Sequence, residues 1–347
     1  MSKAFYYAYI GTNSVRGSKG IYCLKIYSDT LQPEIVSTYD LYNSGGLDLN
    51  SDETVLLAAC EGMTFHGLAD GGVTRLGLDG DTMNEVSWAP GYGQRTCCVS
   101  ISCDSRNAAA CSFMNGNLAI YSFRPDGTFY LEHNIPTPKA ANMPDALHCV
   151  KILDQSTVAV ISITECAVIL YSMETGKRMG IFRFAENEHP RYIEAYGDTI
   201  YALMQEPGYI YVLGKQADET GKLPMLQKIS ILPSDFAGRC ETTTLRIAPG
   251  GDLLIAASRG NNSLSVFRVN VDGQLSLKSV LRLKGIKPRD FNISRDGQIA
   301  VVACQQSDEV YVYRIDHESY ALVDTAPGRV EIPSPAAVMV GKQKGVY

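Results

Sequence analysis

TTLRIAPGGDLLIAASRGNNSLSVFRVNVDGQL (residues 243–275) is followed in this chain by a second copy of its own pattern, KPRDFNISRDGQIAVVACQQSDEVYVYRIDHESYAL (residues 287–322). Each copy contains an alternating strand, a turn with Gly or Asp, an apolar strand, a polar loop and another alternating strand, and a short strand follows. The apolar runs LLIAAS and IAVVAC are too short to cross a membrane but suit strands buried on both faces. The pattern predicts a repeat of four β-strands.

The repeat recurs along the rest of the chain. Weaker copies begin at Gly46, Cys97, Leu147 and Pro190. A seventh copy is split, with SPAAVMV near the C-terminus as its inner strand and AFYYAYIGTN and GIYCLKIYS near the N-terminus as the next strands. A lone four-stranded sheet cannot bury both faces, and a period of roughly 40 to 50 residues is typical of propeller blades. We therefore expect an all-β, seven-bladed β-propeller of four-stranded blades, formed by residues 1–347 as one domain and closed by pairing N- and C-terminal strands in one blade.

Composition excludes several classes of function. The chain has 347 residues and a net charge of −6, which disfavours a nucleic-acid partner. It lacks a signal-peptide pattern and any apolar run of about 18 residues, so we expect a cytoplasmic protein without membrane contact. The oligomeric state is left open.

The cysteines and histidines show no metal-binding pattern. Ten cysteines occur without C-x-x-C spacing, which predicts free thiols used as small buried side chains. The five histidines are dispersed, so neither a metal nor another cofactor is predicted, although Asp and Glu from different blades leave a Ca²⁺ or Mg²⁺ site open. The Gly-His and Trp-Asp pattern of WD40 propellers does not recur.

Candidate site residues are polar side chains at equivalent ends of successive repeats, because the loops of a propeller present its functional groups there. His148 lies on an inner strand, Arg191 opens the next one, and Glu206 and Arg259 each follow a buried second strand. Singly, each also has a structural interpretation, as a core histidine, an ion-paired arginine or a solvated glutamate. Together, an imidazole, a carboxylate and two guanidiniums suit proton transfer on an anionic substrate. Secondary candidates for substrate binding are Arg289, Gln305 and Glu61.

These residues resemble a known family. The two strong copies, together with YIGTNS and GIYCLKI near the N-terminus, are similar to the seven-bladed propeller lactonases. That family includes the cycloisomerase-type 6-phosphogluconolactonases and the fungal 3-carboxy-cis,cis-muconate lactonizing enzyme. The resemblance spans essentially the whole chain, and it implies an active site at the mouth of the channel that opens or closes lactone rings without a required metal.

The resemblance also implies site residues. The second histidine of the family's His-Pro-His, the arginine of its Pro-Arg-His, the glutamate of its Asn-Glu and the arginine of its Asn-Arg-Gly fall on His148, Arg191, Glu206 and Arg259. The chain departs from the family where a histidine, an Asn-Tyr pair and a glutamate are replaced by Cys98, Ser112-Phe113 and Thr244. Thr244 in particular marks where we expect the substrate to differ.

Three functions remain open at this point. The leading hypothesis is hydrolysis of a sugar-acid lactone such as 6-phosphogluconolactone, with Glu206 as base, His148 as acid, and Arg191 and Arg259 binding the anion and the oxyanion. The second is a lactone-forming isomerase or lyase acting on an unsaturated diacid. The third is a propeller that binds a ligand or a protein without catalysis.

Overall fold

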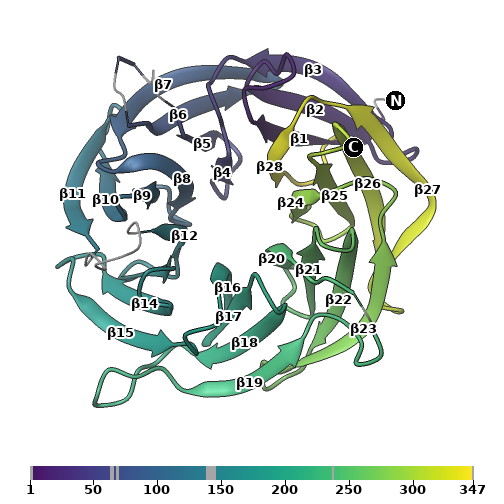
Figure 1. Ribbon diagram of the computed structural model, residues 1–347. Coiled ribbons are helices and arrows are strands. Elements are labelled where there is room, and N and C mark those ends of the chain that lie inside the picture. The colour runs from purple at the N-terminus through teal and green to yellow at the C-terminus, as the bar shows by residue number, and fades with distance from the viewer. Residues whose placement is uncertain (1–2, 63–65, 68–69, 138–145, 237, 346–347) are drawn as a thin grey trace. The chain divides into compact units, whose positions relative to one another are not determined.

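The computed structural model describes residues 3–62, 66–67, 70–137, 146–236 and 238–345. These residues form twenty-eight strands in seven four-stranded antiparallel sheets, and no helix occurs among them (Figure 1). In that part of the chain, accordingly, no helix is long and apolar enough to cross a membrane. The repeat of four strands, present seven times, is confirmed.

The chain divides into two compact units. The first comprises residues 1–40, 194–213 and 225–347, and the second comprises residues 41–193 and 214–224. A single domain spanning the whole chain stays a prediction.

Three sheets lie entirely in the first unit, and a fourth lies mainly in it. One has the order β28 (Pro335–Val340), β1 (Phe5–Thr12), β2 (Ile21–Tyr27) and β3 (Pro33–Tyr39). The next two consist of β20 (Thr242–Ile247), β21 (Leu253–Ser258), β22 (Ser263–Val269) and β23 (Leu275–Arg282), and of β24 (Pro288–Ile293), β25 (Ile299–Cys304), β26 (Glu309–Asp316) and β27 (Ala321–Glu331). The fourth contains β16 (Pro190–Tyr196), β17 (Thr199–Met204), β18 (Tyr209–Gly214) and β19 (Met225–Ser230).

The second unit holds the other three sheets in sequence order. The first contains β4 (Gly46–Leu49), β5 (Val55–Cys60), β6 (Gly72–Asp79) and β7 (Thr82–Pro90). The next contains β8 (Gln94–Ile101), β9 (Asn107–Met114), β10 (Asn117–Phe123) and β11 (Phe129–Pro136). The last contains β12 (Leu147–Ile152), β13 (Thr157–Ser162), β14 (Ala167–Ser172) and β15 (Arg178–Arg183).

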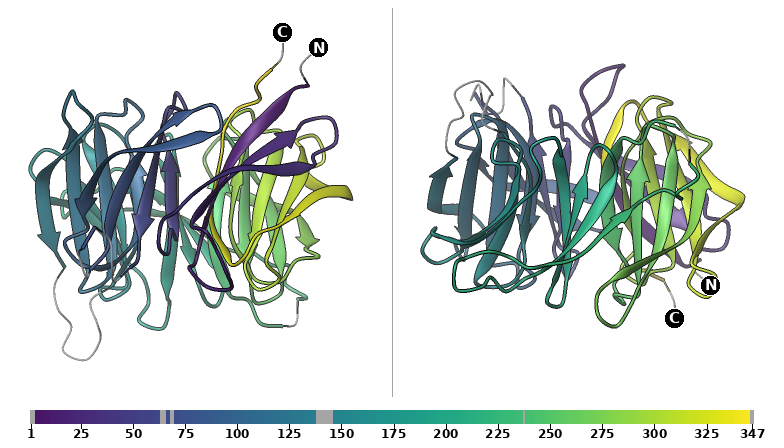
Figure 2. Two further views of the ribbon diagram at one scale, coloured as in Figure 1. Left: turned by 90° about the horizontal axis from the view of Figure 1, so that it is seen from above. Right: turned by 60° about the horizontal axis from the view of Figure 1, so that its bottom comes forward.

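The two ends of the chain meet in one sheet. Strand β28 pairs antiparallel with β1, in a register that sets Ala8 opposite Val340 and Gly11 opposite Ala337. Both termini of the chain therefore emerge close together (Figure 2). The predicted pairing of N- and C-terminal strands is confirmed, and it covers the edge of β1 that would otherwise be unpaired.

Sheets within a unit pack face to face through their middle strands. The second strands β5, β13, β17, β21 and β25 are buried along their whole length, as their apolar sequences predict. The third strands differ from the prediction in part, because some of their polar side chains are buried, whereas Arg268 on β22 and Arg314 on β26 are exposed. In β22, for example, Ser263 and Ser265 are as buried as Val266 and Phe267, since a neighbouring sheet covers each face.

The turns between first and second strands follow the predicted chemistry. After β24, the Ser294 hydroxyl donates to Asp296 and accepts the backbone N–H groups of Gln298 and Ile299. Gly297 adopts a φ of 75°, which favours glycine. This turn brings β25 back antiparallel to β24, with Ile293 opposite Ala300.

All ten cysteines are free thiols, and five of them are buried. Burial raises the pKa of Cys60 to about 11 and that of Cys304 to about 12, so both stay protonated near neutral pH. These thiols act as small apolar side chains, as the sequence predicts. Cys103 is the exception, because it is exposed.

Candidate active site

Glu206 lies in the first unit, two residues after the end of β17. Its Oε1 accepts two hydrogen bonds from Arg239, from Nε at 3.3 Å and from Nη2 at 3.0 Å. This hydrogen bond, with the charges of Glu241 and Glu206, raises the pKa of the Arg239 guanidinium. The predicted base, Glu206, therefore accepts two hydrogen bonds from one guanidinium.

Arg259 follows β21 and is held by a second carboxylate. Its Nη2 donates to Oε1 of Glu241, and its backbone N–H donates to the Glu241 carbonyl at 2.8 Å. Nε2 of Gln205 lies 3.4 Å from the same Oε1, and Nη2 of Arg239 lies 3.2 Å from Oε2. Glu241 therefore links the two arginines.

The four charged side chains Glu206, Arg239, Glu241 and Arg259 form what we call the edge cluster. They alternate in sign, so each arginine lies beside a carboxylate and the formal charges cancel. Their side chains differ in exposure: Arg239 is 69% exposed and Glu206 44%, whereas Arg259 is 25% and Glu241 14% exposed. The cluster therefore has a more buried inner part, Arg259 with Glu241, and a more exposed outer part, Arg239 with Glu206.

Arg239 and Glu241 were not found from the sequence. Both lie in the segment that leads into β20, outside the strands on which the repeat is defined. The available signal was weak: GRCETTT places two charges directly before an inner strand, in the same repeat as Arg259. The pairing of Arg239 with Glu206, which lies 33 positions away in the chain, has no sequence signature.

His148 lies on β12 in the second unit. The Phe113 ring contacts it edge-on, with ring centroids 5.9 Å apart and an interplanar angle of 87°. The Arg95 guanidinium lies 5.4 Å from the centroid of the Phe113 ring, and its Nη2 lies 2.9 Å from Oε2 of Glu61. His148 and the secondary candidate Glu61 are therefore connected through Phe113 and Arg95, neither of which was a candidate.

The other candidate residues lie at different places in the structure. Arg191 is buried at the start of β16, in the second unit. Arg289 is half-buried on β24. Gln305 follows β25, and its backbone carbonyl accepts a 2.7 Å hydrogen bond from Arg16. A common site for His148, Arg191, Glu206 and Arg259 stays a prediction.

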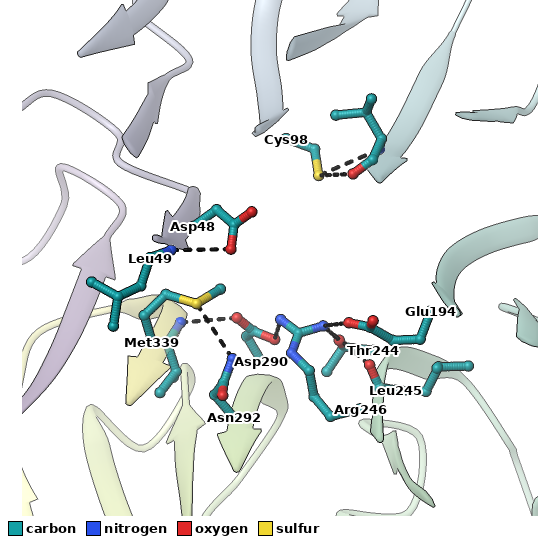
Figure 3. A network of polar contacts seen from close by, with 12 residues as sticks. Asp48, Leu49, Cys98, Glu194, Thr244, Leu245, Arg246, Asp290, Asn292 and Met339 are labelled. Carbon is teal, nitrogen blue, oxygen red and sulfur yellow. Dashed lines mark hydrogen bonds and ion pairs between the residues drawn. The ribbon is translucent and has the colours of Figure 1, made fainter. Parts of the chain in front are cut away.

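A buried charged network occupies the first strands of the sheets in the first unit (Figure 3). Arg246 on β20 donates to Asp290 on β24 at 3.0 Å, and its Nη1 lies 3.6 Å from Glu194 on β16. Nη1 also donates to the hydroxyl of Thr244 at 2.9 Å, while Asp290 accepts the backbone N–H of Val338 on β28 at 2.9 Å. Thr244, where we expected the substrate to differ, is a buried partner of Arg246.

The pKa of Asp290 gives a prediction of pH dependence. Burial raises this pKa, and the Arg246 guanidinium and the Val338 N–H act in the opposite direction. As pH rises from the unfolded pKa of about 3.9 through the higher folded pKa, the unfolded state loses its proton first, so Asp290 lowers the free energy of unfolding. Asp290→Asn removes this loss.

Denaturant unfolding of Asp290→Asn and the wild type across acidic to neutral pH measures the effect. We expect the variant's free energy of unfolding, relative to the wild type, to increase with pH across this window. The difference between the two free energies of unfolding removes the pH dependence contributed by the carboxylates that both proteins share. A difference that is constant with pH would contradict the raised pKa.

Similarity to known proteins identifies the family. The family model described as lactonase, seven-bladed β-propeller, matches residues 7–340. The chain belongs to this family. The lactonase is therefore an enzyme that acts on a small lactone, and its all-β, seven-bladed class is confirmed.

Individual relatives of this lactonase are distant. The 6-phosphogluconolactonase of Bacillus subtilis is 21% identical over 96% of this chain and 97% of its own length. That of Yersinia pestis is 33% identical over 27% of this chain and 28% of its own length. The structure of the periplasmic gluconolactonase of Pseudomonas aeruginosa has a TM-score of 0.86 at 21% identity, over 97% of this chain and 99% of that chain, which shows the shared fold. The cytoplasmic location of this lactonase stays a prediction.

Within the described residues, no three His, Cys, Asp or Glu side chains are grouped in a way that can hold a metal ion. The chemistry at hand is that of carboxylates, guanidiniums and an imidazole. These groups can move protons and stabilise negative charge.

Proposed function

We propose that this lactonase hydrolyses the lactone of a sugar acid, with 6-phosphogluconolactone as the first candidate. Membership of the lactonase family supports the reaction, and the names of the Bacillus and Yersinia relatives support the candidate. The observation that carries the assignment of residues is the edge cluster. It joins Glu206 and Arg259, two residues singled out from the repeat, through one pair of charged neighbours.

In the proposed mechanism, Glu206 takes a proton from water as the water oxygen attacks the lactone carbonyl carbon. The carbonyl oxygen becomes negatively charged in the tetrahedral intermediate, and Arg259 and Arg191 stabilise that charge. The bond from the carbonyl carbon to the ring oxygen then breaks, and the ring oxygen takes a proton from His148. The product is the open-chain hydroxy acid, and His148 then regains the proton that Glu206 holds, through solvent.

A pH-indicator assay tests the proposal, because each lactone opened releases an acid. We expect the protein to open 6-phosphogluconolactone or glucono-δ-lactone far faster than either opens in buffer alone. Opening of every sugar-acid lactone at its spontaneous rate would show that the proposed hydrolysis is wrong. A loss of ultraviolet absorbance with a conjugated muconate-type diacid would instead assign the lactone-forming reaction.

A further inference from the structure

Arg239 differs from the other arginine of the edge cluster in how firmly its side chain is held. Arg259 is anchored through its side chain to Glu241, and its backbone N–H and that of Gly260 donate to the Glu241 carbonyl at 2.8 and 3.3 Å. Arg239 is bonded to Glu206 and Glu241, yet its side chain is 69% exposed. An exposed ion pair contributes little to stability, so the Arg239 guanidinium can leave at small cost.

The backbone that carries Arg239 nevertheless packs closely against the loop that follows β21. Gly260 lies so close to the neighbouring loop that a Cβ there would meet the Arg239 carbonyl oxygen at 2.8 Å and the Glu241 nitrogen at 2.7 Å. The two loops therefore pack backbone against backbone, which explains the glycine. Arg239 has a fixed Cα and a side chain that can swing, while Arg259 stays with Glu241.

The charge balance of the cluster requires such a movable cation. Two carboxylates compensate two guanidiniums, so an anion that approaches the cluster meets no uncompensated positive charge within it. An anion gains the full positive charge and the paired N–H groups of a guanidinium in this cluster when it draws one away from a carboxylate. Glu206 is the carboxylate with the weaker hold, because it is 44% exposed whereas Glu241 is 14% exposed.

We infer that Arg239 is the residue that recognises the anionic substituent of the lactone and, in doing so, uncovers Glu206. The inference rests on the proposed function. In the free enzyme the Arg239 guanidinium covers the Glu206 carboxylate. A phosphate or carboxylate on the substrate accepts the two N–H groups in its place, since a guanidinium matches both anions in bidentate geometry. Glu206 is then released to take a proton from water, so a charged lactone prepares its own general base.

This arrangement makes Arg239 a determinant of specificity. A neutral lactone offers nothing to draw Arg239 away, so it meets Glu206 in its covered state. An anionic lactone both binds Arg239 and frees the carboxylate. The enzyme therefore prefers anionic lactones, and the preference depends on Arg239.

The test compares Arg239→Gln with the wild type on three lactones: 6-phosphogluconolactone, a glucarolactone with a carboxylate, and neutral glucono-δ-lactone. Loss of charged hydrogen bonds predicts a fall in kcat/KM of about 10- to 100-fold for the anionic lactone that Arg239 recognises. For the neutral lactone, removal of the covering cation predicts a rise of about two- to fivefold. Whether phosphate or carboxylate is recognised is decided by which anionic lactone shows the larger fall.

Two further variants sharpen the comparison. Arg239→Lys keeps the charge without the planar fork, so it should restore part of the anionic preference. Arg329→Gln is the matched control, because Arg329 is 53% exposed and forms an analogous 2.9 Å ion pair with Glu309. The control should leave the ratio of kcat/KM for the anionic lactones to kcat/KM for glucono-δ-lactone unchanged. With glucono-δ-lactone as substrate, inorganic phosphate should raise the rate of the wild type, because it draws Arg239 away from Glu206, and it should not raise the rate of Arg239→Gln.

The outcomes separate this inference from the proposed function. An equal fall for charged and neutral lactones, with normal thermal unfolding, would give Arg239 a structural role and overturn the inference while hydrolysis stands. The inference would also be overturned if Arg329→Gln lowered the ratio of kcat/KM for anionic lactones to kcat/KM for the neutral lactone as much as Arg239→Gln does. Failure of the wild type to open any of the three lactones would overturn the proposed function and the inference with it.

Discussion

Replacement of Glu206 by Gln is expected to lower kcat for lactone opening by about 10²- to 10⁴-fold, the usual contribution of a general base. The amide keeps the size of the side chain, but it cannot take a proton from water at neutral pH. It also keeps an oxygen that can accept from Arg239, so the loop is expected to hold its position. Initial rates in the pH-indicator assay, corrected for spontaneous opening, measure the effect.

Glu309→Gln is the matched control for this experiment. Glu309 accepts a 2.9 Å hydrogen bond from the exposed Arg329, much as Glu206 accepts one from Arg239, and it has no proposed part in catalysis. We expect Glu309→Gln to retain wild-type kcat. If Glu206→Gln opened the best lactone at the wild-type rate, Glu206 would not be the base.

Replacement of Arg246 by Met is expected to lower the free energy of unfolding by about 3 to 5 kcal/mol, the usual result of breaking a buried ion pair. Methionine fills much of the same volume, so the effect is chiefly electrostatic. The change leaves Asp290 and Glu194 buried without the guanidinium that lies 3.0 Å from one and 3.6 Å from the other. Urea denaturation followed by circular dichroism measures the loss.

Two comparisons show whether the loss comes from the buried carboxylates. Arg329→Met removes an exposed arginine from an ion pair, and it should cost no more than about 1 kcal/mol. In an Asp290→Asn background, Arg246→Met should cost less than in the wild type, with a coupling of about 0.5 to 3 kcal/mol. Equal losses in the two backgrounds would mean that Asp290 and Arg246 do not depend on each other.

The blades were predictable because each is a local pattern. Strand alternation, turn residues and apolar runs all act within about ten residues, and seven repetitions of the pattern reinforce one another. The inferred starts at Gly46, Leu147 and Pro190 coincide with the first residues of β4, β12 and β16. The sheet formed from both ends of the chain was also predictable. SPAAVMV resembles an inner strand with no following strands, and the N-terminal segments resemble the following strands with no inner strand.

Part of the candidate site was predictable for the same reason. Glu206 and Arg259 each follow a second strand, which is a position that the repeat itself defines. Both are charged residues that closely follow an apolar strand, so they could be recognised as candidates from the sequence. Arg239 lies in a connecting segment that no repeat position describes, so nothing in the sequence linked it to Glu206.

By itself, the sequence determined the class of fold, the sevenfold repeat and the positions of the polar residues that follow the strands. Only the tertiary structure decided which charges meet: Arg239 with Glu206, Glu241 with Arg259, and Arg246 with Asp290. The physical reason is range. Backbone pattern is set by neighbours along the chain, whereas an ion pair between residues 33 or 44 positions apart depends on how loops and sheets pack, which periodicity does not encode.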